Sequence, residues 1–431
     1  MTKLITKQYS FYALLAGVVF LLGMPAAEAG PAKVDRITVG TKDWPWWRGP
    51  AGNGIAAAEQ NPPLSWSDSE NIVWSAPLPG RGHGSATVVG DQVVLATADE
   101  VREIQSVLCL SRHTGELLWK RAIHVGGLEK KSNEKASQAS CTLACDGKRF
   151  FVNFLNKGVV YTTAVSREGE KLWQTKVSEY VTHQGFSSSP ALYGPLVIVS
   201  ADTKRGGAIC GLNRASGEEV WRVERPKLPN YVSPSILRVA GRTQLLFSGC
   251  DLVTSLDPLT GTKLWETKGA TTECVTTMVT DGQRVFTSGG YPRNHVSAIV
   301  ADGSREVAWN QSVRVYVPSM LVRDRYLYVV ADAGIAVCFN SEDGSSLWRG
   351  RLGGTFSSSP VMVGDHILAT NERGATFVYK ANPAAFELVG QNQLGEEVFA
   401  TPTVCGGRIY LRSASREGGR RRETLYCIGR K

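Results

Sequence analysis

The stretch that decides the fold is SLDPLTGTKLW, Ser255–Trp265. Its second half, a turn glycine followed four positions later by a tryptophan, recurs as HTGELLW, REGEKLW, ASGEEVW and EDGSSLW. A glycine at a fixed offset is typical of a tight β-turn with one residue in the left-handed conformation. The glycines are Gly115, Gly169, Gly217, Gly261 and Gly344, and the repeated tryptophans are Trp74, Trp119, Trp173, Trp221, Trp265, Trp309 and Trp348.

A second motif, rich in Ser and Pro, lies between successive tryptophans and begins an apolar strand, as in GFSSSPALYG. Units of about 45 residues with four short strands and no helical period indicate β-propeller blades. The sequence therefore predicts an all-β, eight-bladed propeller of four-stranded antiparallel blades. The aligned positions of this motif are Ala86, Cys141, Pro190, Pro234, Thr276, Pro318, Pro360 and Pro402.

The repeated tryptophans have a structural explanation. Neighbouring blades twist apart, and a large flat ring on an outer strand fills the wedge between them. The eighth unit lacks the tryptophan, and we expect Phe386 or Val389 to replace it. We also expect the strand at Trp74 to pair with Leu425–Ile428, since closure of the ring removes exposed sheet edges.

The N-terminus reads as a secretory signal peptide. Lys3 and Lys7 precede the apolar run Phe11–Gly23, and Ala27–Ala29 matches a small-residue cleavage site. The apolar run is shorter than the ~20 residues that span a bilayer, which favours cleavage over a membrane anchor. We expect residues 1–29 to be removed, residues 30–63 to form an extension and residues 64–431 to form the propeller. The protein would then be periplasmic or secreted.

Charge and cysteine content narrow the possible partners. The formal net charge is +9, but no interleaving of basic and aromatic residues indicates nucleic-acid binding. The densest basic cluster lies in Arg416–Arg422, and we interpret it as a solvated hairpin tip. Nine cysteines are an odd number for an exported chain, so at least one is expected to be unpaired in a monomer.

The repeats SLDPLTGTKLW, GLNRASGEEVW and CFNSEDGSSLW resemble the tryptophan-docking repeat of the PQQ-like eight-bladed propellers. That superfamily includes quinoprotein alcohol dehydrogenases and the non-enzymatic outer-membrane assembly factor BamB. The stretches DWPWWRGPAGNG and GRGHGSATV look like a secreted bacterial branch labelled PQQ-binding-like repeat proteins. The resemblance covers Asp43 to the C-terminus and implies the propeller fold.

For an enzyme of this superfamily, the resemblance implies PQQ with a Ca²⁺ ion held by carboxylate and amide oxygens near a catalytic Asp. The sequence departs from that pattern, because it has no adjacent cysteine pair and its strand-ending acids stand singly. Asp202 and Asp332 fall in one repeat slot, which favours turn capping over catalysis. BamB-like proteins are lipid-anchored through a Cys that is not found here. We therefore predict no catalytic residues and no metal ligands.

Residues just before the Ser/Pro motif are expected at the mouth of the central channel, where propellers bind ligands. No G-x-S-x-G elbow surrounds Ser187–Ser189, whose hydroxyls we expect to satisfy backbone groups. The insert GLEKKSNEKASQ, Gly127–Gln138, reads as an exposed loop. The candidates for ligand or cofactor binding are His83, His183, Tyr231, Glu273, Tyr316 and Phe356.

Three functions follow from these observations. The first is a non-catalytic binding or scaffold module of the cell envelope, with a protein partner or a small ligand at the channel mouth. The second is a PQQ-dependent dehydrogenase that oxidises an alcohol or a sugar, with PQQ and Ca²⁺ as cofactors. The third is a carbohydrate-binding module that uses Trp44, Trp46 and Trp47; the alternative for these residues is a strap packed across the propeller.

Overall fold

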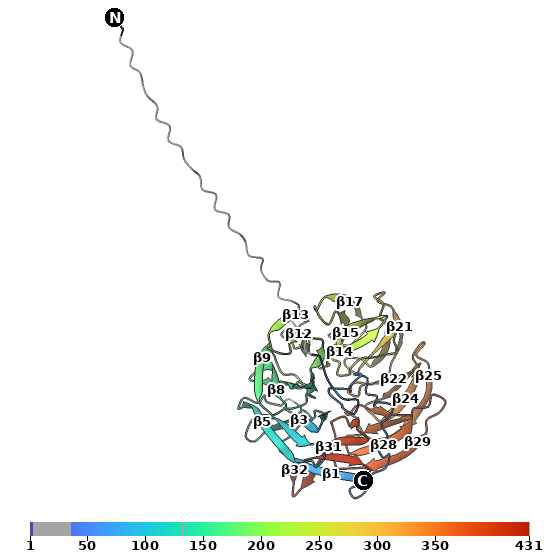
Figure 1. The fold of residues 1–431 in the computed structure, drawn as a ribbon. Helices are drawn as coiled ribbons and strands as arrows, with labels where there is room; N and C mark the ends of the chain where they lie inside the picture. The colour runs from blue at the N-terminus through green and yellow to red at the C-terminus, as the bar shows by residue number, and fades with distance from the viewer. Residues whose placement is uncertain (3–35, 132, 431) are drawn as a thin grey trace. The chain divides into compact units, whose positions relative to one another are not determined.

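The protein is an eight-bladed β-propeller, as the sequence predicts. The computed structural model describes residues 1–2, 36–131 and 133–430, and the residues from Arg36 on belong to one compact unit. They form 32 strands in eight four-stranded antiparallel sheets arranged around a common centre (Figure 1). The predicted signal peptide lies outside the described residues except for Met1 and Thr2. Among the described residues, no helix is long and apolar enough to cross a membrane.

Seven blades are built from four strands that follow one another in sequence from the channel outward. They are β2 (Thr87–Val89), β3 (Gln92–Asp99), β4 (Ile104–Ser111) and β5 (Leu117–Val125); β6 (Ala144–Cys145), β7 (Arg149–Asn156), β8 (Val159–Ser166) and β9 (Lys171–Glu179); β10 (Ala191–Tyr193), β11 (Leu196–Ala201), β12 (Ala208–Asn213) and β13 (Glu219–Glu224); β14 (Ser235–Val239), β15 (Arg242–Gly249), β16 (Leu252–Leu256) and β17 (Lys263–Lys268); β18 (Val279–Thr280), β19 (Arg284–Gly289), β20 (His295–Val300) and β21 (Val307–Gln311); β22 (Leu321–Arg323), β23 (Tyr326–Val330), β24 (Ile335–Asn340) and β25 (Ser346–Arg351); and β26 (Val361–Val363), β27 (His366–Thr370), β28 (Ala375–Lys380) and β29 (Leu388–Gln393).

The eighth blade joins the two ends of the described ring. It combines β30 (Thr403–Cys405), β31 (Arg408–Glu417) and β32 (Arg420–Gly429) with β1 (Ile72–Leu78) as the outermost strand. The pairing places Trp74 opposite Cys427 and Ala76 opposite Leu425. β1 and β32 lie side by side in Figure 1. The expected closure through Leu425–Ile428 is therefore confirmed.

The outer-strand tryptophans lie against the turn of the following blade. Trp74 covers Gly115, Trp309 covers Gly344, and a Cβ on either glycine would lie within 2.6 Å of the ring. Both glycines have positive φ, which the turn requires. The indole Nε1 of Trp74 donates to the carbonyl of Arg112 at 3.0 Å. Trp119, Trp173 and Trp221 cover Gly169, Gly217 and Gly261 in the same way, whereas Trp265 donates to Gln244 Oε1.

The outer strand without a tryptophan differs from our expectation. Gly390 lies opposite Val378, in the register that the other blades give to tryptophan. Phe386 lies four residues earlier, where it packs on Trp348 with ring centroids 5.5 Å apart, and Val389 is 46% exposed. Neither residue replaces the missing ring. Trp66 from the N-terminal segment lies at this blade, since its backbone N–H donates to Asn392 Oδ1 on β29. Its side chain is buried.

The Ser/Pro motif links neighbouring blades around the channel at six of the eight junctions. The hydroxyl of Ser233 accepts the N–H of Ser189 at 2.9 Å, and the hydroxyl of Ser189 accepts the N–H of Thr142 at 3.0 Å. The expectation is confirmed for Ser187 and Ser189, whose hydroxyls bind backbone groups, but not for Ser188, whose hydroxyl lies 2.8 Å from that of Ser200. We call the residues that accept such bonds the hydroxyl belt; they are Thr142, Ser189, Ser233, Ser319, Ser359 and Thr401.

The hydroxyl belt also corrects the sequence alignment in three blades. Ser189, which precedes Pro190, is equivalent to Thr142 and Ser319 by its hydrogen bonds. Thr277 takes the same place, since its N–H donates to Ser319 Oγ. The position of Pro190 is therefore filled by Leu143, Met278 and Met320 in those blades, two residues beyond Cys141, Thr276 and Pro318.

Native-state thiols are expected to resist alkylation and disulfide exchange. All nine cysteines are buried and free. Burial raises the pKa of Cys141 to about 12 and that of Cys427 to about 11, so almost no reactive thiolate exists near neutral pH. An aromatic disulfide reagent should label no cysteine within minutes in the folded protein and all nine in denaturant. Rapid labelling of any thiol in the folded protein would contradict this prediction.

Candidate functional site at the channel mouth

The N-terminal segment 44–56 passes across the channel as a strap. Trp44 exchanges backbone hydrogen bonds with Val88 of β2 at 2.8 and 3.0 Å, and Ile55 forms a bridge with Met362 of β26. The indole Nε1 of Trp47 donates to Thr277 Oγ1 at 2.6 Å. Trp44 is only 2% exposed. Trp44 therefore packs within the strap, whereas Trp46 and Trp47 are partly exposed and line cavities.

Arg48 fixes the strap to two blades. Its guanidinium is 1% exposed and donates to the carbonyls of Pro360 at 2.9 Å, Met320 at 2.6 Å and Asn53 at 3.0 Å. Burial lowers the pKa of Arg48 to about 9, so the group is still charged at neutral pH. The strap thus depends on one buried cation whose Nη atoms donate to backbone carbonyls.

Two adjoining cavities lie at the channel mouth, and Trp47 lines the smaller of them. The inner chamber, of about 240 Å³, contains Trp47, His83, Phe399, Tyr231 and the hydroxyl belt. It shares Tyr231, Ser187 and Gln184 with a wider cavity of about 590 Å³, the outer mouth. The outer mouth is lined mainly by His183, Phe186, Tyr231, Glu273, Tyr291, Arg314 and Tyr316.

The structure brings five of the six candidate residues to these two compartments. His183, Tyr231, Glu273 and Tyr316 line the outer mouth, and His83 lines the inner chamber. Phe356 lies elsewhere: it is 1% exposed, packs in the core and has its ring centroid 6.1 Å from that of Phe377. Its neighbour Ser357 reaches the chamber instead, because alternate residues of an extended chain point to opposite sides.

Glu273 organises the polar part of the outer mouth. Its carboxylate lies 3.3 Å from His183 Nε2 and accepts a hydrogen bond from the Tyr316 hydroxyl at 3.1 Å. Lys204 Nζ lies 2.9 Å from His183 Nδ1, so Nδ1 is the acceptor and Nε2 carries the proton toward Glu273. Burial, and then the charge of Glu273, raise the pKa of Tyr316. The tyrosine is therefore a hydrogen-bond donor and not a base.

Two further residues support Tyr316. Arg314 lies over its ring at 5.3 Å, and Asp332 accepts its backbone N–H at 2.7 Å. Burial raises the pKa of Asp332. Asp332 therefore binds the backbone of a segment 16 residues away and does not cap its own turn, and Asp202 forms a buried ion pair with Arg225 at 3.0 Å, so the expected turn capping is not what these residues do.

His83 is a neutral group of the inner chamber. Its ring stacks on Phe399 with centroids 4.4 Å apart, and its Nε2 is buried without a hydrogen-bonding partner among the described residues. Burial, with the positive charges of Arg81, Arg412 and others, lowers the pKa of His83 well below its usual value. The imidazole is thus uncharged at neutral pH.

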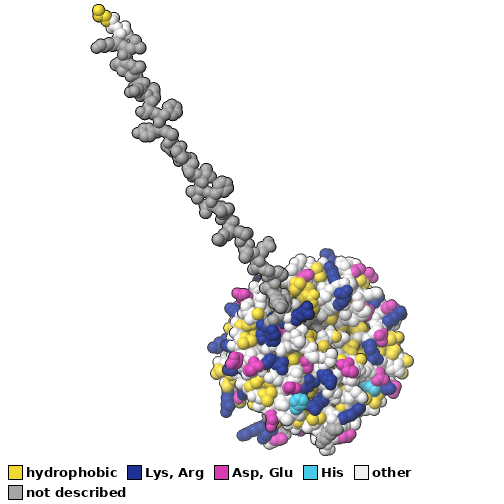
Figure 2. Space-filling view, viewed as in Figure 1, with side chains coloured by type: hydrophobic (Ala, Val, Ile, Leu, Met, Phe, Trp, Pro, Cys, Tyr) yellow, Lys and Arg dark blue, Asp and Glu magenta, His cyan; other side chains and the backbone are white. Residues whose placement is uncertain are grey.

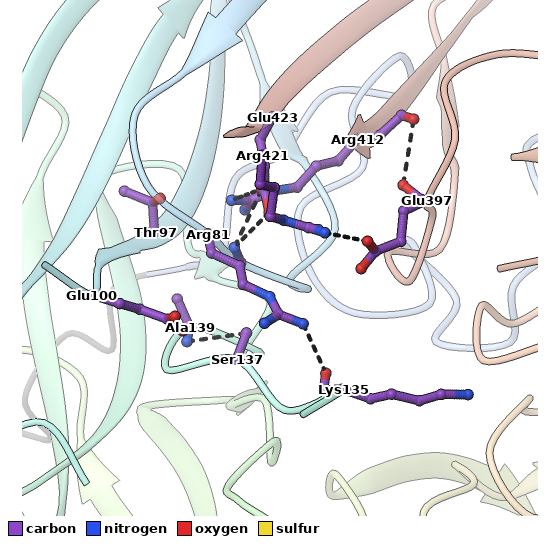
Figure 3. Close-up of polar contacts among 12 residues, drawn as sticks. Arg81, Thr97, Glu100, Lys135, Ser137, Ala139, Glu397, Arg412, Arg421 and Glu423 are labelled. Atoms are coloured by element: carbon purple, nitrogen blue, oxygen red, sulfur yellow. Dashed lines mark hydrogen bonds and ion pairs between the residues drawn. The ribbon is translucent and has the colours of Figure 1, made fainter. Parts of the chain in front are cut away.

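Of the nearby arginines, Arg412 and Arg421 belong to the ion-pair cluster drawn in Figure 3, whereas Arg81 donates to backbone carbonyls. Glu423 on β32 accepts Arg412 Nε at 2.6 Å and Arg421 Nη2 at 3.1 Å, and Arg421 also pairs with Glu397. Arg421 therefore turns inward and is not part of a solvated tip. Arg416, Arg420 and Arg422 are exposed, as we predicted for the hairpin.

The polar insert covers the inner chamber. Lys135 Nζ reaches Glu372 at 2.7 Å, and Glu372 also accepts the Ser357 hydroxyl. Asn133 Nδ2 donates to Gln184 Oε1 at 3.0 Å. We call residues 133–138 the covering loop; we had expected it to be simply exposed. The residues that it contacts lie in blades distant in the sequence. The local sequence pattern therefore does not predict these contacts.

The acids at the mouth do not form the donor set that Ca²⁺ prefers. Both oxygens of Glu273 are engaged, and Asp202 is held by Arg225 and Asn230. Within residues 36–131 and 133–430, no three His, Cys, Asp or Glu side chains are grouped so as to hold a metal ion. The residues present thus do not match the Ca²⁺ site of a quinoprotein.

Acid is expected to destabilise the propeller through its buried histidines. Burial lowers the pKa of His124 and His295 to about 4, whereas an unfolded histidine titrates near 6.5. The unfolded state then binds more protons, so the free energy of unfolding falls as the pH drops through about 6.5 toward about 4. For His295, only 2% exposed, the loss is on the order of 3 kcal/mol. Urea titrations across this pH range should show the fall, and His295→Gln should make it shallower; a pH-independent stability would contradict us.

A family model described as outer membrane protein assembly factor BamB matches residues 103–350 and 332–423. The chain is 27% identical over 234 residues to outer membrane protein assembly factor BamB of Alkalilimnicola ehrlichii, across 53% of this chain and 49% of that protein. It is 25% identical over 224 residues to a polyvinylalcohol dehydrogenase of a Pseudomonas species, across 46% of this chain and 33% of that protein. The chain thus spans about half of the first relative and a third of the second.

Among solved structures, BamB from Moraxella catarrhalis has the same fold. The TM-score is 0.58 with 16% identical residues, over 82% of this chain and 96% of that chain. The resemblance stated from the repeats is therefore confirmed.

Proposed function

Because the chain belongs to the family described as outer membrane protein assembly factor BamB, we propose that it is an exported, non-catalytic binding module of the cell envelope. In this proposal the outer mouth receives an extended segment of a partner protein. The family relationship supports the envelope location, and the geometry of the mouth supports binding.

The observation that carries the proposal is the lining of the outer mouth. Tyr291 is 56% exposed at its edge, and Phe186, Tyr231 and Tyr316 provide further aromatic surface. Glu273 and Arg314 add one charge of each sign, and both are already held in position by hydrogen bonds. Rigid aromatic groups with a few fixed polar groups are typical of binding surfaces, because little side-chain entropy is lost on association.

The charge distribution fits a protein partner better than a polyanion. Basic and acidic side chains are interspersed over the face shown in Figure 2, with apolar groups between them. A nucleic acid would require a continuous basic surface. Mixed charges with aromatic anchors are the usual composition of a protein–protein contact.

Site-specific crosslinking tests this proposal. A photoreactive phenylalanine analogue at position 291 should give a light-dependent adduct with an envelope protein in the producing cell. The matched control is the same analogue at Leu259, which is 45% exposed on the turn between β16 and β17. Adducts at both positions, or at neither, would count against a binding site at the mouth.

The similarity to a polyvinylalcohol dehydrogenase favours a second candidate, a PQQ-dependent dehydrogenase. Calorimetric titration of the mature chain with PQQ, with and without Ca²⁺, separates the two functions. Under the first proposal no saturable binding is expected at tens of micromolar PQQ. Ca²⁺-dependent saturation would favour the dehydrogenase and would justify assays with alcohols and sugars.

A further inference from the structure

The inner chamber is a compartment that the binding of a protein segment at the outer mouth leaves unused. It lies beneath the outer mouth, with Trp47 at its end and the covering loop on one side. Its volume of about 240 Å³ corresponds to roughly eight water molecules. That space is suited to one small molecule and not to a folded segment.

Hydroxyl groups dominate the chamber wall. Ser233, Ser319 and Ser359 line it from three blades, and each accepts one backbone N–H from a neighbouring blade. Their hydroxyl protons have no acceptor among the described residues, and each oxygen keeps a free lone pair. The wall therefore offers both donors and acceptors that converge on the channel axis.

Charge is almost excluded from this compartment. Lys135 is the single charged side chain among the described residues that line it, and its ammonium is paired with Glu372. His83 contributes a neutral ring with an unpartnered Nε2, and the buried Tyr231 contributes a hydroxyl beside the Gln184 backbone. A charged ligand would lose its hydration without gaining a counter-ion, which is costly.

Aromatic faces complete the chamber. Trp47 is held by its bond to Thr277, and the stacked pair His83 and Phe399 forms part of the wall. Flat rings beside hydroxyl groups present apolar and polar surface together. A molecule with C–H faces and a rim of hydroxyls matches both.

We propose that the inner chamber binds a neutral, polyhydroxylated molecule of about the size of one sugar ring. The hydroxyl belt and His83 Nε2 hydrogen-bond the hydroxyls of the ligand, and Trp47 packs against its carbon face. The covering loop lies over the bound molecule through Lys135 and Glu372. This site adjoins the protein-binding surface proposed for the outer mouth and shares Tyr231 and Ser187 with it.

Isothermal titration calorimetry of the mature chain tests the proposal with three neutral probes, glycerol, D-glucose and myo-inositol. At least one should saturate with a Kd of about 1 mM or lower. D-Gluconate, which carries a charge on a similar skeleton, should bind at least about tenfold more weakly than D-glucose. Failure of all three neutral probes to saturate at tens of millimolar, or equal binding of gluconate, would overturn it.

Variants locate the site. His83→Phe keeps the stacking on Phe399 but removes the ring nitrogen, and it should weaken the binding probe about tenfold. Ser187→Phe should abolish binding by filling the chamber entrance. Ser75→Phe on the exposed face of β1 is the matched control and should bind as the parent does. Melting temperatures establish that each variant is folded; a folded Ser187→Phe that binds unchanged would also overturn the proposal.

The two proposals fail separately. Loss of crosslinking at Tyr291 with retained sugar binding would remove only the protein-binding function. Crosslinking without saturable binding of any neutral probe would remove only the chamber ligand.

Discussion

Replacing Arg48 by alanine is expected to lower the free energy of unfolding by about 3–5 kcal/mol. The substitution removes three hydrogen bonds from a charged donor and leaves the buried carbonyls of Pro360 and Met320 without that donor. It also opens a cavity that the strap cannot easily fill, because Gly54 lies directly against the guanidinium. Equilibrium denaturation of the purified chain measures the loss.

The matched control for Arg48 is Arg102→Ala. The Arg102 side chain is 78% exposed and makes one long contact with Asp99. Its removal should change stability by no more than about 0.5 kcal/mol. If the two variants were equally stable, the buried position of Arg48 across the channel would be wrong.

Trp309→Ala is the second substitution with a large expected effect, a loss of about 3–5 kcal/mol. The indole is 8% exposed, lies between Phe286 and Phe339, and donates to the Ser341 carbonyl at 2.8 Å. Its removal leaves a wedge between two blades that rigid strands cannot close. Thermal and denaturant unfolding should both report the loss.

Two further variants separate the causes of this effect. Trp309→Phe keeps an aromatic ring but removes the N–H, so it should cost less than the alanine variant. Gly344→Ala should also destabilise, because the new Cβ would lie 2.5 Å from the Trp309 ring. Gly303→Ala is its control: φ is again positive, but the Cβ would meet no atom within 4 Å. Equal losses at Gly344 and Gly303 would show that backbone strain alone, and not the ring contact, sets the cost.

Repetition explains how much of the fold the sequence could predict. Seven tryptophans at one register define blade number, strand order and closure, because each blade packs against its neighbour in the same way. The alignment was wrong by two residues at Cys141 and Thr276, where no proline marks the start of the strand, and at Pro318, where the proline lies two residues too early. The buried Trp66 escaped notice because it precedes the first repeat and has no equivalent to align with.

The candidate site was predictable in part for a different reason. His183, Tyr231, Glu273 and Tyr316 meet at one end of the channel because they occupy related positions in successive blades. The prediction for Phe356 was wrong because a shift of one residue along an extended strand reverses the side to which the side chain points. The contact of Lys135 with Glu372 joins residues 237 positions apart, and no local pattern carries that information.

The pairing of β1 with β32 has a consequence for biogenesis. β1 pairs with the last strand of the ring, so a chain emerging from a ribosome or a translocation pore cannot close the propeller until β32 has been synthesised. Joining segments some 350 residues apart costs on the order of 5 kcal/mol in chain entropy, which the completed interface must recover. Until then β1 is an unpaired strand, and an unpaired strand edge promotes aggregation. A chaperone would therefore protect the chain most during this period.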